Sequence, residues 1–307
     1  MSHIFDISLI IPVYNNQLFL RECLQSAVSQ TDVNMEIIIV DDCSTDDSVS
    51  IIRDFAKKDT RIKFIPCQEK IGVALARNKA MDLAQGEYIA FLDADDFYPH
   101  NNVLNKLLAT IKQHNVVICG GSLNKFDQKK QELITQIKDQ YFTENQYMKY
   151  ADYQHDGGFY RFLYKRDFLN QHQLRFKNLI RYQDAEFFVR TMITAQEFYV
   201  VKDCTYVYRV NHKVIDWTHQ RLKDHLTGVL SVLTLSKQYN YQILHYKLAK
   251  NFLDVLKHKM CCRYWEKVLL SPLIIKVFKA ICFDMLKNKD FQVKLYPSKY
   301  LRAYFFW

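Results

Sequence analysis

The chain has 307 residues, of which 49% are hydrophobic and 24% are charged. This composition is ordinary for a folded protein and excludes a disordered chain, a collagen-like repeat and a coiled coil. The length allows one large domain with a C-terminal addition.

The net charge of +9 lies in the C-terminal part of the chain. Residues 1–220 hold 26 basic and 28 acidic side chains, whereas residues 221–307 hold 16 basic, 5 acidic and 15 aromatic side chains. Such a segment could bind an anionic membrane surface, an acidic glycan or nucleic acid. The alternative is a helical subdomain whose lysines are simply solvated. Because the chain holds no RNA- or DNA-recognition motif, we predict no nucleic-acid partner.

The first residues, Met1 to Asp6, lack the basic and apolar pattern of a signal peptide, so we expect a cytoplasmic protein. Its eight cysteines have no zinc-site spacing, and in that compartment we expect free thiols. The most apolar stretch, Val268 to Leu286, is interrupted by Pro272 and by charged side chains. We therefore expect this stretch to lie on a bilayer or to pack inside, and not to cross a membrane.

The first 120 residues alternate between short β-rich runs and helical periodicity, which predicts a parallel sheet with crossover helices. The expected strands cover residues 7–13, 36–40, 62–65, 88–92 and 116–119. The expected helices cover residues 20–28, 49–55, 73–84 and 103–114. We expect Asn15 and Asn16 to cap the first helix, Ser44 with Asp47 to cap the second, and Gly86 to close the third.

The second part of the chain is less regular. Residues 121–180 predict a mixed region with irregular strands, followed by a helix over 186–195. Residues 198–201 and 205–208 are expected to be extended, and residues 211–218 to form a polar loop. From Leu222 onward apolar residues recur every three or four positions, which predicts a mostly helical C-terminal region.

Acidic side chains follow two of the expected strands. Asp41 and Asp42 end one strand, and Asp93, Asp95 and Asp96 end another. Ligands of an open parallel sheet bind beyond the carboxyl ends of its strands, so these carboxylates are expected to face one cleft. Such a cluster needs a cation, and Mg²⁺ or Mn²⁺ bridging carboxylates to the phosphates of a nucleotide diphosphate fits it. The alternative is a set of solvated aspartates that cap helices.

Four ordered segments carry a family resemblance: residues 10–15 (IIPVYN), 40–46 (VDDCSTD), 72–78 (GVALARN) and 91–96 (FLDADD). Together they resemble the family 2 glycosyltransferases. The resemblance implies a GT-A fold, an α/β Rossmann-like mixed sheet with flanking helices, beside the mostly helical C-terminal region. It also implies a catalytic domain over 1–220, with a nucleotide-sugar half over about 1–120 and an acceptor half over about 121–220, and a separate region over 221–307.

The resemblance implies a donor site at the first strands. Asp42, with Asp41 as its neighbour, would read the base of the nucleotide, and Pro12 and Tyr14 would line the same pocket. Because Asp42 could accept the imide N–H of uracil, a UDP-sugar is the expected donor. A glycine-rich dinucleotide-binding turn does not follow the first expected strand, which excludes a dinucleotide-dependent dehydrogenase.

The same resemblance assigns the diphosphate and the metal. Asp93 and Asp95 are similar to the family's Asp-X-Asp element, with Asp93 facing ribose or sugar and Asp95 binding Mn²⁺ or Mg²⁺. Arg77 matches a position near the donor, where it would pair with phosphate or a carboxylate, or it is a surface helix arginine. Arg209 would stabilise the diphosphate, and His212 would reach the phosphate or complete the metal shell, or it is simply solvated.

The resemblance also implies the general base, through a fifth segment, residues 182–187 (YQDAEF). Asp184 matches the base position, and Gln183 stands where the family usually has glutamate. Glu186 is the rival base if the register of the loop is displaced. An inverting transfer needs one such base to take the proton of the acceptor hydroxyl while the metal neutralises the departing diphosphate.

The resemblance therefore implies an inverting, metal-dependent transferase that acts on a growing glycan such as lipooligosaccharide or capsule. A lipid-linked acceptor would fit peripheral contact with the inner membrane face. The apolar face expected to enter the membrane consists of Val268, Leu269, Leu273, Ile274, Val277, Phe278, Ile281 and Cys282, flanked by Lys276, Lys279 and Lys287. The alternatives are that this face packs on the catalytic domain or a second subunit, and that the protein is a catalytically silent glycan- or nucleotide-binding scaffold.

Overall fold

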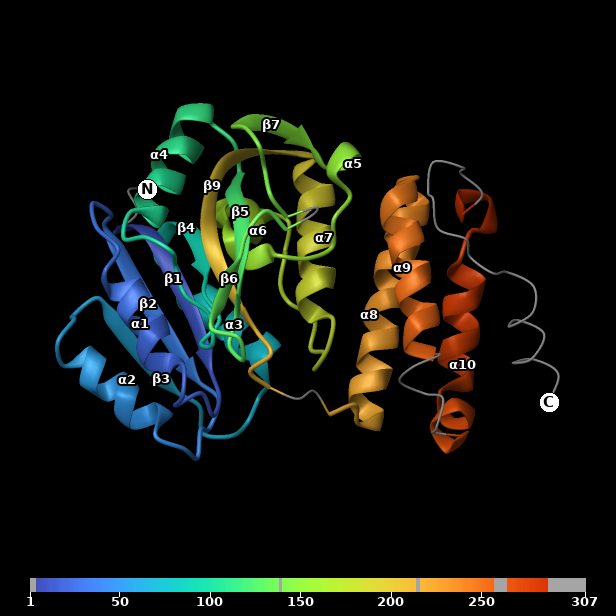
Figure 1. Cartoon of the computed structure of the whole chain (residues 1–307), viewed down its shortest axis with the longest axis horizontal. Helices are drawn as coiled ribbons and strands as arrows, with labels where there is room; N and C mark the ends of the chain where they lie inside the picture. Colours follow the sequence, from blue (N-terminus) through green and yellow to red (C-terminus); the bar gives the residue numbers. More distant parts are fainter. Residues whose placement is uncertain (1–3, 138–139, 214–215, 257–263, 287–307) are drawn as a thin grey trace. The chain divides into compact units, whose positions relative to one another are not determined.

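A computed structural model of the chain describes residues 4–137, 140–213, 216–256 and 264–286 (Figure 1). The chain divides into two compact units, Met1–Gly228 and Val229–Trp307. The division falls within helix α8 (His219–Gln238), whereas a boundary after residue 220 is expected from the sequence. The functional roles expected for the separate segments stay predictions.

The first unit contains a sheet of nine strands in the order β3-β2-β1-β4-β8-β5-β9-β7, with β6 paired to β5. The strands are β1 (Phe5–Val13), β2 (Met35–Asp41), β3 (Ile62–Pro66), β4 (Gly86–Phe91), β5 (Ile118–Asp127), β6 (Glu132–Ile134), β7 (Gln146–Lys149), β8 (Phe162–Lys165) and β9 (Glu197–Val210).

The helices of this unit before α8 are α1 (Leu20–Val28), α2 (Ser48–Ala56), α3 (Val73–Leu83), α4 (Val103–His114), α5 (Tyr150–Tyr153), η1 (Phe159–Arg161), α6 (Arg166–Gln171) and α7 (Gln183–Ala195). The second unit holds the end of α8, α9 (Gln242–Asp254), α10 (Tyr264–Ala280) and η3 (Phe283–Leu286). The expectation of a mixed α/β sheet followed by a helical region is confirmed.

Strands β1 to β4 are parallel, as predicted for the first part of the chain. The register sets Val13 of β1 beside Asp41 of β2, and Ile10 of β1 beside Phe91 of β4. The acidic residues that follow β2 and β4 therefore leave the sheet at the same edge.

The sheet is covered on both faces because its strands alternate apolar side chains between them. Ile7, Leu9 and Ile11 of β1 share one core with apolar residues of α1, α2 and α4. On the other face, Phe91 contacts the rings of Phe176 and of Phe187 from α7. Packing on both faces holds β1 and β4 in place, and with them the edge of the sheet that carries Asp41 and Asp93.

The less regular middle of the chain completes the sheet by long-range pairing. Strand β8 lies antiparallel between β4 and β5, so β5 is not the direct neighbour of β4. Strand β5 continues to Asp127, beyond the expected end at residue 119. The two extended segments expected at 198–201 and 205–208 form one strand, β9, of 14 residues, which pairs parallel with β5.

The expected helix caps are wrong in their details. Helix α3 ends at Leu83, and Gly86 instead begins β4. A Cβ at Gly86 would lie 2.5 Å from the backbone nitrogen of Ser8, so the glycine permits the close approach of β1 and β4. The side chains of Asn15 and Ser44 join two loops, because Thr45 N donates to Asn15 Oδ1 and Asn15 N donates to Ser44 Oγ.

In the second unit, part of the apolar face predicted for residues 268–282 is buried, while the side chains of Val268 and Leu269 lie outside the described residues. Val277 is fully buried, Ile281 is 6% exposed, and the ring of Phe278 contacts that of Phe252 in α9. The prediction that Val277 and Ile281 enter a membrane is therefore wrong, while Lys287 lies outside the described residues. None of the described helices is long and apolar enough to span a bilayer. Peripheral membrane contact through other residues stays a prediction.

A buried histidine links three segments of the second unit. His245 of α9 shares a hydrogen bond of 2.8 Å with Ser236 Oγ, and its Nε2 accepts from Cys282 N at 2.9 Å. Burial first, and then the charge of Lys237, lowers the pKa of His245 from 6.5 to about 4. The imidazole is therefore neutral at pH 7 and joins the ends of α8 and α10.

Lowering the pH is expected to destabilise these helices through His245. The unfolded chain binds the imidazole proton near pH 6.5 and the folded chain only near pH 4, so stability is lost as the pH falls between these values. The thermal midpoint of the wild type should fall over this interval more steeply than that of His245→Gln. Exposed His172, changed to glutamine, is the control. Equal slopes for the wild type and His245→Gln would contradict this role.

Candidate functional site

The acidic pair at the end of β2 organises the loop before α3. Asp42 is 3% exposed, and its carboxylate accepts from the backbone N–H groups of Ile71 at 2.6 Å and Gly72 at 2.9 Å. Gly72 has a φ of 88°, which glycine adopts without strain. Asp41 accepts from Ser44 N through Oδ2, while its Oδ1 is buried without a hydrogen-bond partner among the described residues. One acceptor of the pair thus remains available.

Pro12 and Tyr14 lie at the end of β1, next to this pair. Pro12 is buried within the strand, whereas Tyr14 is 41% exposed. The Nζ of Lys70 stands 3.5 Å from the centre of the Tyr14 ring, a cation–π contact. An exposed aromatic ring and a lysine cation therefore flank the loop that Asp42 holds.

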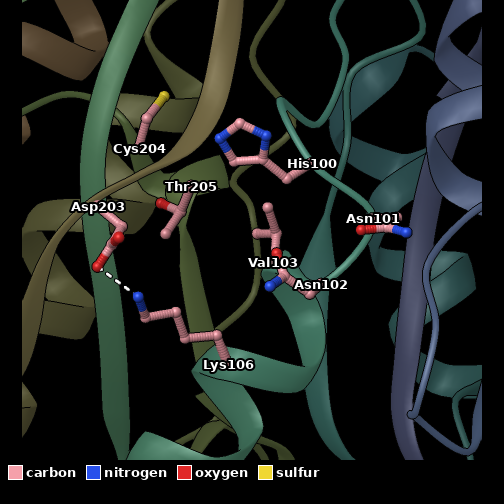
Figure 2. A pocket seen from close by; sticks show the side chains of 8 residues that line it. All are labelled: His100, Asn101, Asn102, Val103, Lys106, Asp203, Cys204 and Thr205. Carbon is pink, nitrogen blue, oxygen red and sulfur yellow. Dashed lines mark ion pairs between the residues drawn. The ribbon is translucent and has the colours of Figure 1, made fainter.

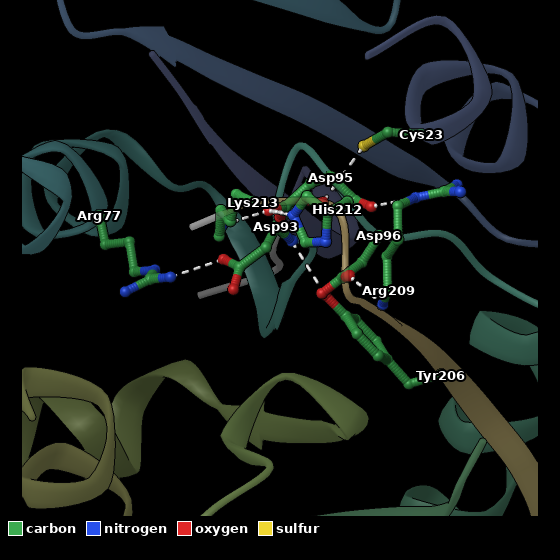
Figure 3. Close-up of polar contacts among 9 residues, drawn as sticks. All are labelled: Cys23, Arg77, Asp93, Asp95, Asp96, Tyr206, Arg209, His212 and Lys213. Atoms are coloured by element: carbon green, nitrogen blue, oxygen red, sulfur yellow. Dashed lines mark hydrogen bonds and ion pairs between the residues drawn. The ribbon is translucent and has the colours of Figure 1, made fainter. Parts of the chain in front are cut away.

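Arg77 of α3 connects this region with the acidic segment after β4. Its Nη2 donates to Asp93 Oδ1 at 2.5 Å (Figure 3), and its guanidinium lies over the rings of Phe159 and Phe176. Arg77 is 4% exposed, and its Nε and Nη1 have no partner in the described part of the chain. The alternative of a surface helix arginine is wrong, because this side chain is buried with N–H groups to spare.

Asp95 lies in an ion-pair cluster with the segment that follows β9. Its Oδ2 is 2.8 Å from His212 Nε2 and 2.5 Å from Lys213 Nζ (Figure 3). Burial alone would raise the pKa of Asp95, but the contacts with His212 and Lys213 outweigh it and hold that pKa well below its usual range. Asp95 is therefore ionised at neutral pH.

Asp93 and Asp96 have the opposite tendency. Burial is the largest cause that raises the pKa of Asp93; the charge of Asp95 adds to it and Arg77 opposes it. Burial also raises the pKa of Asp96, followed by the charges of Asp95 and Asp93. Asp96 accepts from the hydroxyl of Tyr206 at 2.8 Å, which fixes it below the surface (Figure 3). Because the charge of Asp95 contributes to both shifts, a cation bound beside these carboxylates would oppose them.

Arg209 holds the acidic segment against β9. Its backbone N donates to Asp96 Oδ1 at 2.7 Å, and its Nε donates to the carbonyl of Asp95 at 2.8 Å. The other two guanidinium nitrogens bond Gln128 and Glu22, and the side chain is 3% exposed. These contacts position the Asp95 loop, and the diphosphate contact expected for Arg209 stays a prediction.

Asp184 stands in the first turn of α7, half-buried, and shares its surroundings with the acidic segment. The phenol of Tyr208 connects them. The pKa of Tyr208 is raised by burial first and then by the charges of Asp96, Asp93, Asp95 and Asp184. Asp184 thus contributes to this shift, more weakly than the three carboxylates that follow β4.

The rival base Glu186 has different surroundings. It is fully buried, and its Oε1 lies 3.0 Å from Arg190 Nε and 2.8 Å from Lys177 Nζ. These two cations pair with the carboxylate and hold it in place. Glu186 is thus engaged in ion pairs, and the choice of Asp184 as the base stays a prediction.

Comparison with known proteins gives the family. The sequence model of glycosyl transferase family 2 matches residues 8–173, which is more than half of the chain. This chain belongs to glycosyl transferase family 2. The uncharacterized glycosyltransferase EpsJ of Bacillus subtilis is 28% identical over 97% of this chain and 89% of its own length. The enzyme is thus a glycosyltransferase by family.

Solved structures show that this glycosyltransferase has the GT-A fold. S. aureus TarS 1–349 in complex with UDP-GlcNAc aligns with a TM-score of 0.71 and 18% identity, over 91% of this chain and 82% of that one. The mannosyltransferase PcManGT from Pyrobaculum calidifontis in complex with GDP-Man and Mn²⁺ aligns with a TM-score of 0.54 and 16% identity, over 94% and 89%. At these identities the similarity concerns the fold.

The residues at Asp95 fit a divalent cation. One carboxylate oxygen and one imidazole nitrogen, 2.8 Å apart, are ligands that Mn²⁺ and, through oxygen, Mg²⁺ accept. Within the described ranges, no group of three or more His, Cys, Asp or Glu side chains is arranged to hold a metal.

Two contacts of this glycosyltransferase were not predicted from the sequence. Lys213 follows His212 in a polar loop where a lysine is ordinarily solvated, yet it pairs with Asp95. Asp96 belongs to the recognised acidic segment, but its burial against Tyr206 depends on the pairing of β9 with β5. Lys213 could have been predicted because it directly follows His212, which was already a candidate ligand. The sequence near Asp96 holds no pattern that predicts its contact with Tyr206.

A separate cavity of about 320 Å³ lies at the start of α4 (Figure 2). It is lined by residues 100–103, by residues 203–205 and by Lys106, whose Nζ lies 2.6 Å from Asp203 Oδ2. None of the predicted site residues lines it. The donor of this glycosyltransferase is therefore not assigned to the cavity.

Proposed function

We propose that this enzyme is an inverting glycosyltransferase that moves a sugar from a nucleotide donor, UDP-linked in the first instance, to a hydroxyl group of a growing glycan. The observation that carries the proposal is the acidic segment after β4, where Asp93 pairs with Arg77 and Asp95 pairs with His212 and Lys213. An acid cluster beside buried cationic donors suits a diphosphate and a divalent ion, with one carboxylate left to act on the acceptor.

The donor base would bind between the loop after β1 and the loop held by Asp42. Both Asp42 oxygens already accept backbone N–H groups, whereas Asp41 Oδ1 has no partner among the described residues. We therefore assign the imide contact of uracil, expected at Asp42, to its neighbour Asp41. A buried acceptor without a donor costs about 1–3 kcal/mol, which a uracil N–H would relieve. TarS, which binds UDP-GlcNAc, supports a uracil donor.

The diphosphate would lie between Arg77 and Asp95. The Nε and Nη1 of Arg77, which have no partner among the described residues, would each donate to a phosphate oxygen. Asp95 and His212 would hold Mn²⁺ or Mg²⁺, and PcManGT, which binds Mn²⁺, supports that choice. When bound, the cation neutralises the charge that develops on the leaving diphosphate.

Asp184 would act on the other substrate. Its carboxylate would accept the proton of the acceptor hydroxyl as that oxygen attacks the anomeric carbon. The rings of Tyr160 and Tyr208, whose centres stack 5.6 Å apart, would help to shape this side of the acceptor site. A base on the face opposite the leaving group gives inversion of configuration.

A panel of UDP-, GDP-, ADP- and CMP-sugars tests the proposal directly. With Mn²⁺ or Mg²⁺ present, we expect release of nucleotide from at least one UDP-sugar and none from ADP- or CMP-sugars. Chelation of the metal should remove most of the turnover, because the diphosphate then leaves without charge compensation. Turnover of a GDP-sugar alone would contradict the assignment of uracil to Asp41, and undiminished turnover with chelator would contradict the role of Asp95.

A further inference from the structure

Tyr182 has a strained backbone directly before the helix that carries Asp184. Its φ of 70° and ψ of 7° lie in the left-handed region, which a bulky side chain rarely adopts. Such a conformation costs on the order of 1–3 kcal/mol and persists only when its surroundings enforce it. Its carbonyl accepts from Glu186 N at 3.1 Å, so Tyr182 sets the first turn of α7.

Three contacts enforce this conformation. The Tyr182 hydroxyl donates to Asp156 Oδ2 at 2.7 Å, and the ring meets the edge of His225 at 4.9 Å. A Cβ at Gly228 of α8 would lie 2.8 Å from the Tyr182 Cβ, so glycine is required for this approach. Burial first, and then the charge of Asp156, raises the pKa of Tyr182 well above its usual range, so the phenol stays a hydrogen-bond donor.

The loop that carries Asp156 is itself held in one conformation. The hydroxyl of Tyr150 donates to the carbonyl of His155 at 2.8 Å, and Gly157 N donates to His155 Nδ1 at 3.1 Å. Gly158 ends the loop with a φ of 85°, which favours glycine. Asp156 therefore offers a fixed acceptor to Tyr182 and is not an incidental surface contact.

We propose that Tyr182 and Asp156 are positioning residues, which act through the first turn of α7 to aim the carboxylate of Asp184 at the acceptor hydroxyl. The inference rests on the proposed function, because it takes Asp184 as the base. The left-handed conformation of Tyr182 lies two residues before Asp184. Backbone strain of this kind concentrates at functional sites. A carboxylate displaced by about 1 Å loses on the order of a hundredfold in rate.

The proposal is tested by removing either partner of the hydrogen bond between the Tyr182 hydroxyl and the Asp156 carboxylate. Tyr182→Phe and Asp156→Asn should each lower kcat for nucleotide release from the UDP-sugar identified by the panel by about tenfold to a hundredfold, with water or glycan as acceptor. The KM for the donor should stay within about twofold, because Asp95 and Arg77 do not touch this pair. The double variant should be no slower than the slower single variant, since both changes remove one bond.

Gly228→Ala provides a variant that leaves both partners of the bond in place. The added methyl group presses on the Tyr182 side chain and should lower kcat like the other two variants. Thr227→Ala, one residue earlier on α8, is the matched control and should keep the wild-type kcat. Equal kcat in Gly228→Ala and the control would show that the position of Tyr182 is not used.

Amide hydrogen exchange keeps the test independent of turnover. Tyr182→Phe and Asp156→Asn should speed exchange at the first turn of α7, including the Glu186 amide, at an unchanged thermal midpoint. Unaltered exchange or unaltered kcat would overturn the proposal, and a rise confined to KM would show direct substrate contact instead. If the wild type releases no nucleotide from any donor, the proposed function is contradicted. Amide hydrogen exchange in the variants then still shows whether Tyr182 and Asp156 hold the first turn of α7 in place.

Discussion

Replacing Asp184 by asparagine is expected to lower the rate of sugar transfer by more than about a hundredfold. Asparagine keeps the size of the side chain but cannot accept the proton of the acceptor hydroxyl. Binding of UDP in the presence of Mn²⁺ should change by less than about twofold, because His212 and Asp95 lie in other segments and keep their contact. Steady-state nucleotide release and calorimetric titration with UDP separate the two effects.

Glu186→Gln is the matched control for this variant. Glu186 is buried in ion pairs with Arg190 and Lys177, so its loss should weaken the fold and leave the chemistry of the folded fraction intact. The thermal midpoint should fall, while kcat per folded molecule should remain near that of the wild type. A hundredfold loss in Glu186→Gln at normal UDP binding, with Asp184→Asn fully active, would transfer the role of base to Glu186.

Replacing Asp95 by asparagine is expected to cause a loss of similar size through a different step. The change removes the carboxylate that pairs with His212 and Lys213 and that would hold the divalent ion. Transfer should fall by more than about a hundredfold, and the remaining rate should no longer respond to Mn²⁺. Paramagnetic resonance of free Mn²⁺ should detect weaker metal binding even without a donor.

Asp47→Asn is the control for that measurement. Asp47 is an exposed aspartate at the start of α2 and lies outside the acidic cluster, so its loss removes the same charge from the chain. Its Mn²⁺ binding and transfer rate should match the wild type. Normal metal binding by Asp95→Asn, or a metal response that survives in its residual activity, would contradict the assignment of Asp95.

The first four strands could be predicted because their signals are local. Residues 7–13 form an apolar run interrupted only by Ser8, and β1 covers it fully. Residues 36–40, which are apolar after Glu36, lie within β2. Once these strands are parallel, the common edge for Asp41 and Asp93 follows from their register. The sequence alone therefore predicts that Asp41 and the acidic segment after β4 are neighbours.

The middle of the chain could not be predicted because its strands depend on distant partners. Strand β8 has four residues and lies between β4 and β5, a pairing that no local pattern encodes. Strand β9 keeps its length through a bend at Lys202–Cys204 by pairing with β5 across a register shift. Because residues 202–204 interrupt the β-rich pattern, the sequence predicts two extended segments where the structure has one strand.

The sequence identifies candidate residues of the site more readily than the contacts that these residues make. Arg209 carries a charge typical of a phosphate ligand, yet its burial among Glu22, Gln128 and the Asp95 carbonyl depends on three segments far apart in the chain. The backbone conformation of Tyr182 likewise depends on Gly228 and Asp156. Motif position identifies residue types, whereas these roles follow from long-range packing.

The most direct test of the proposed mechanism is a crystal structure of Asp184→Asn with an intact UDP-sugar and Mn²⁺, since this variant should bind the donor without consuming it. We predict Mn²⁺ on the side chains of Asp95 and His212, phosphate oxygens near Arg77, and uracil beside Asp41. The substituted side chain at position 184 should face the anomeric carbon from the side away from the diphosphate. A donor bound elsewhere, or a side chain at position 184 directed away from the sugar, would contradict the mechanism.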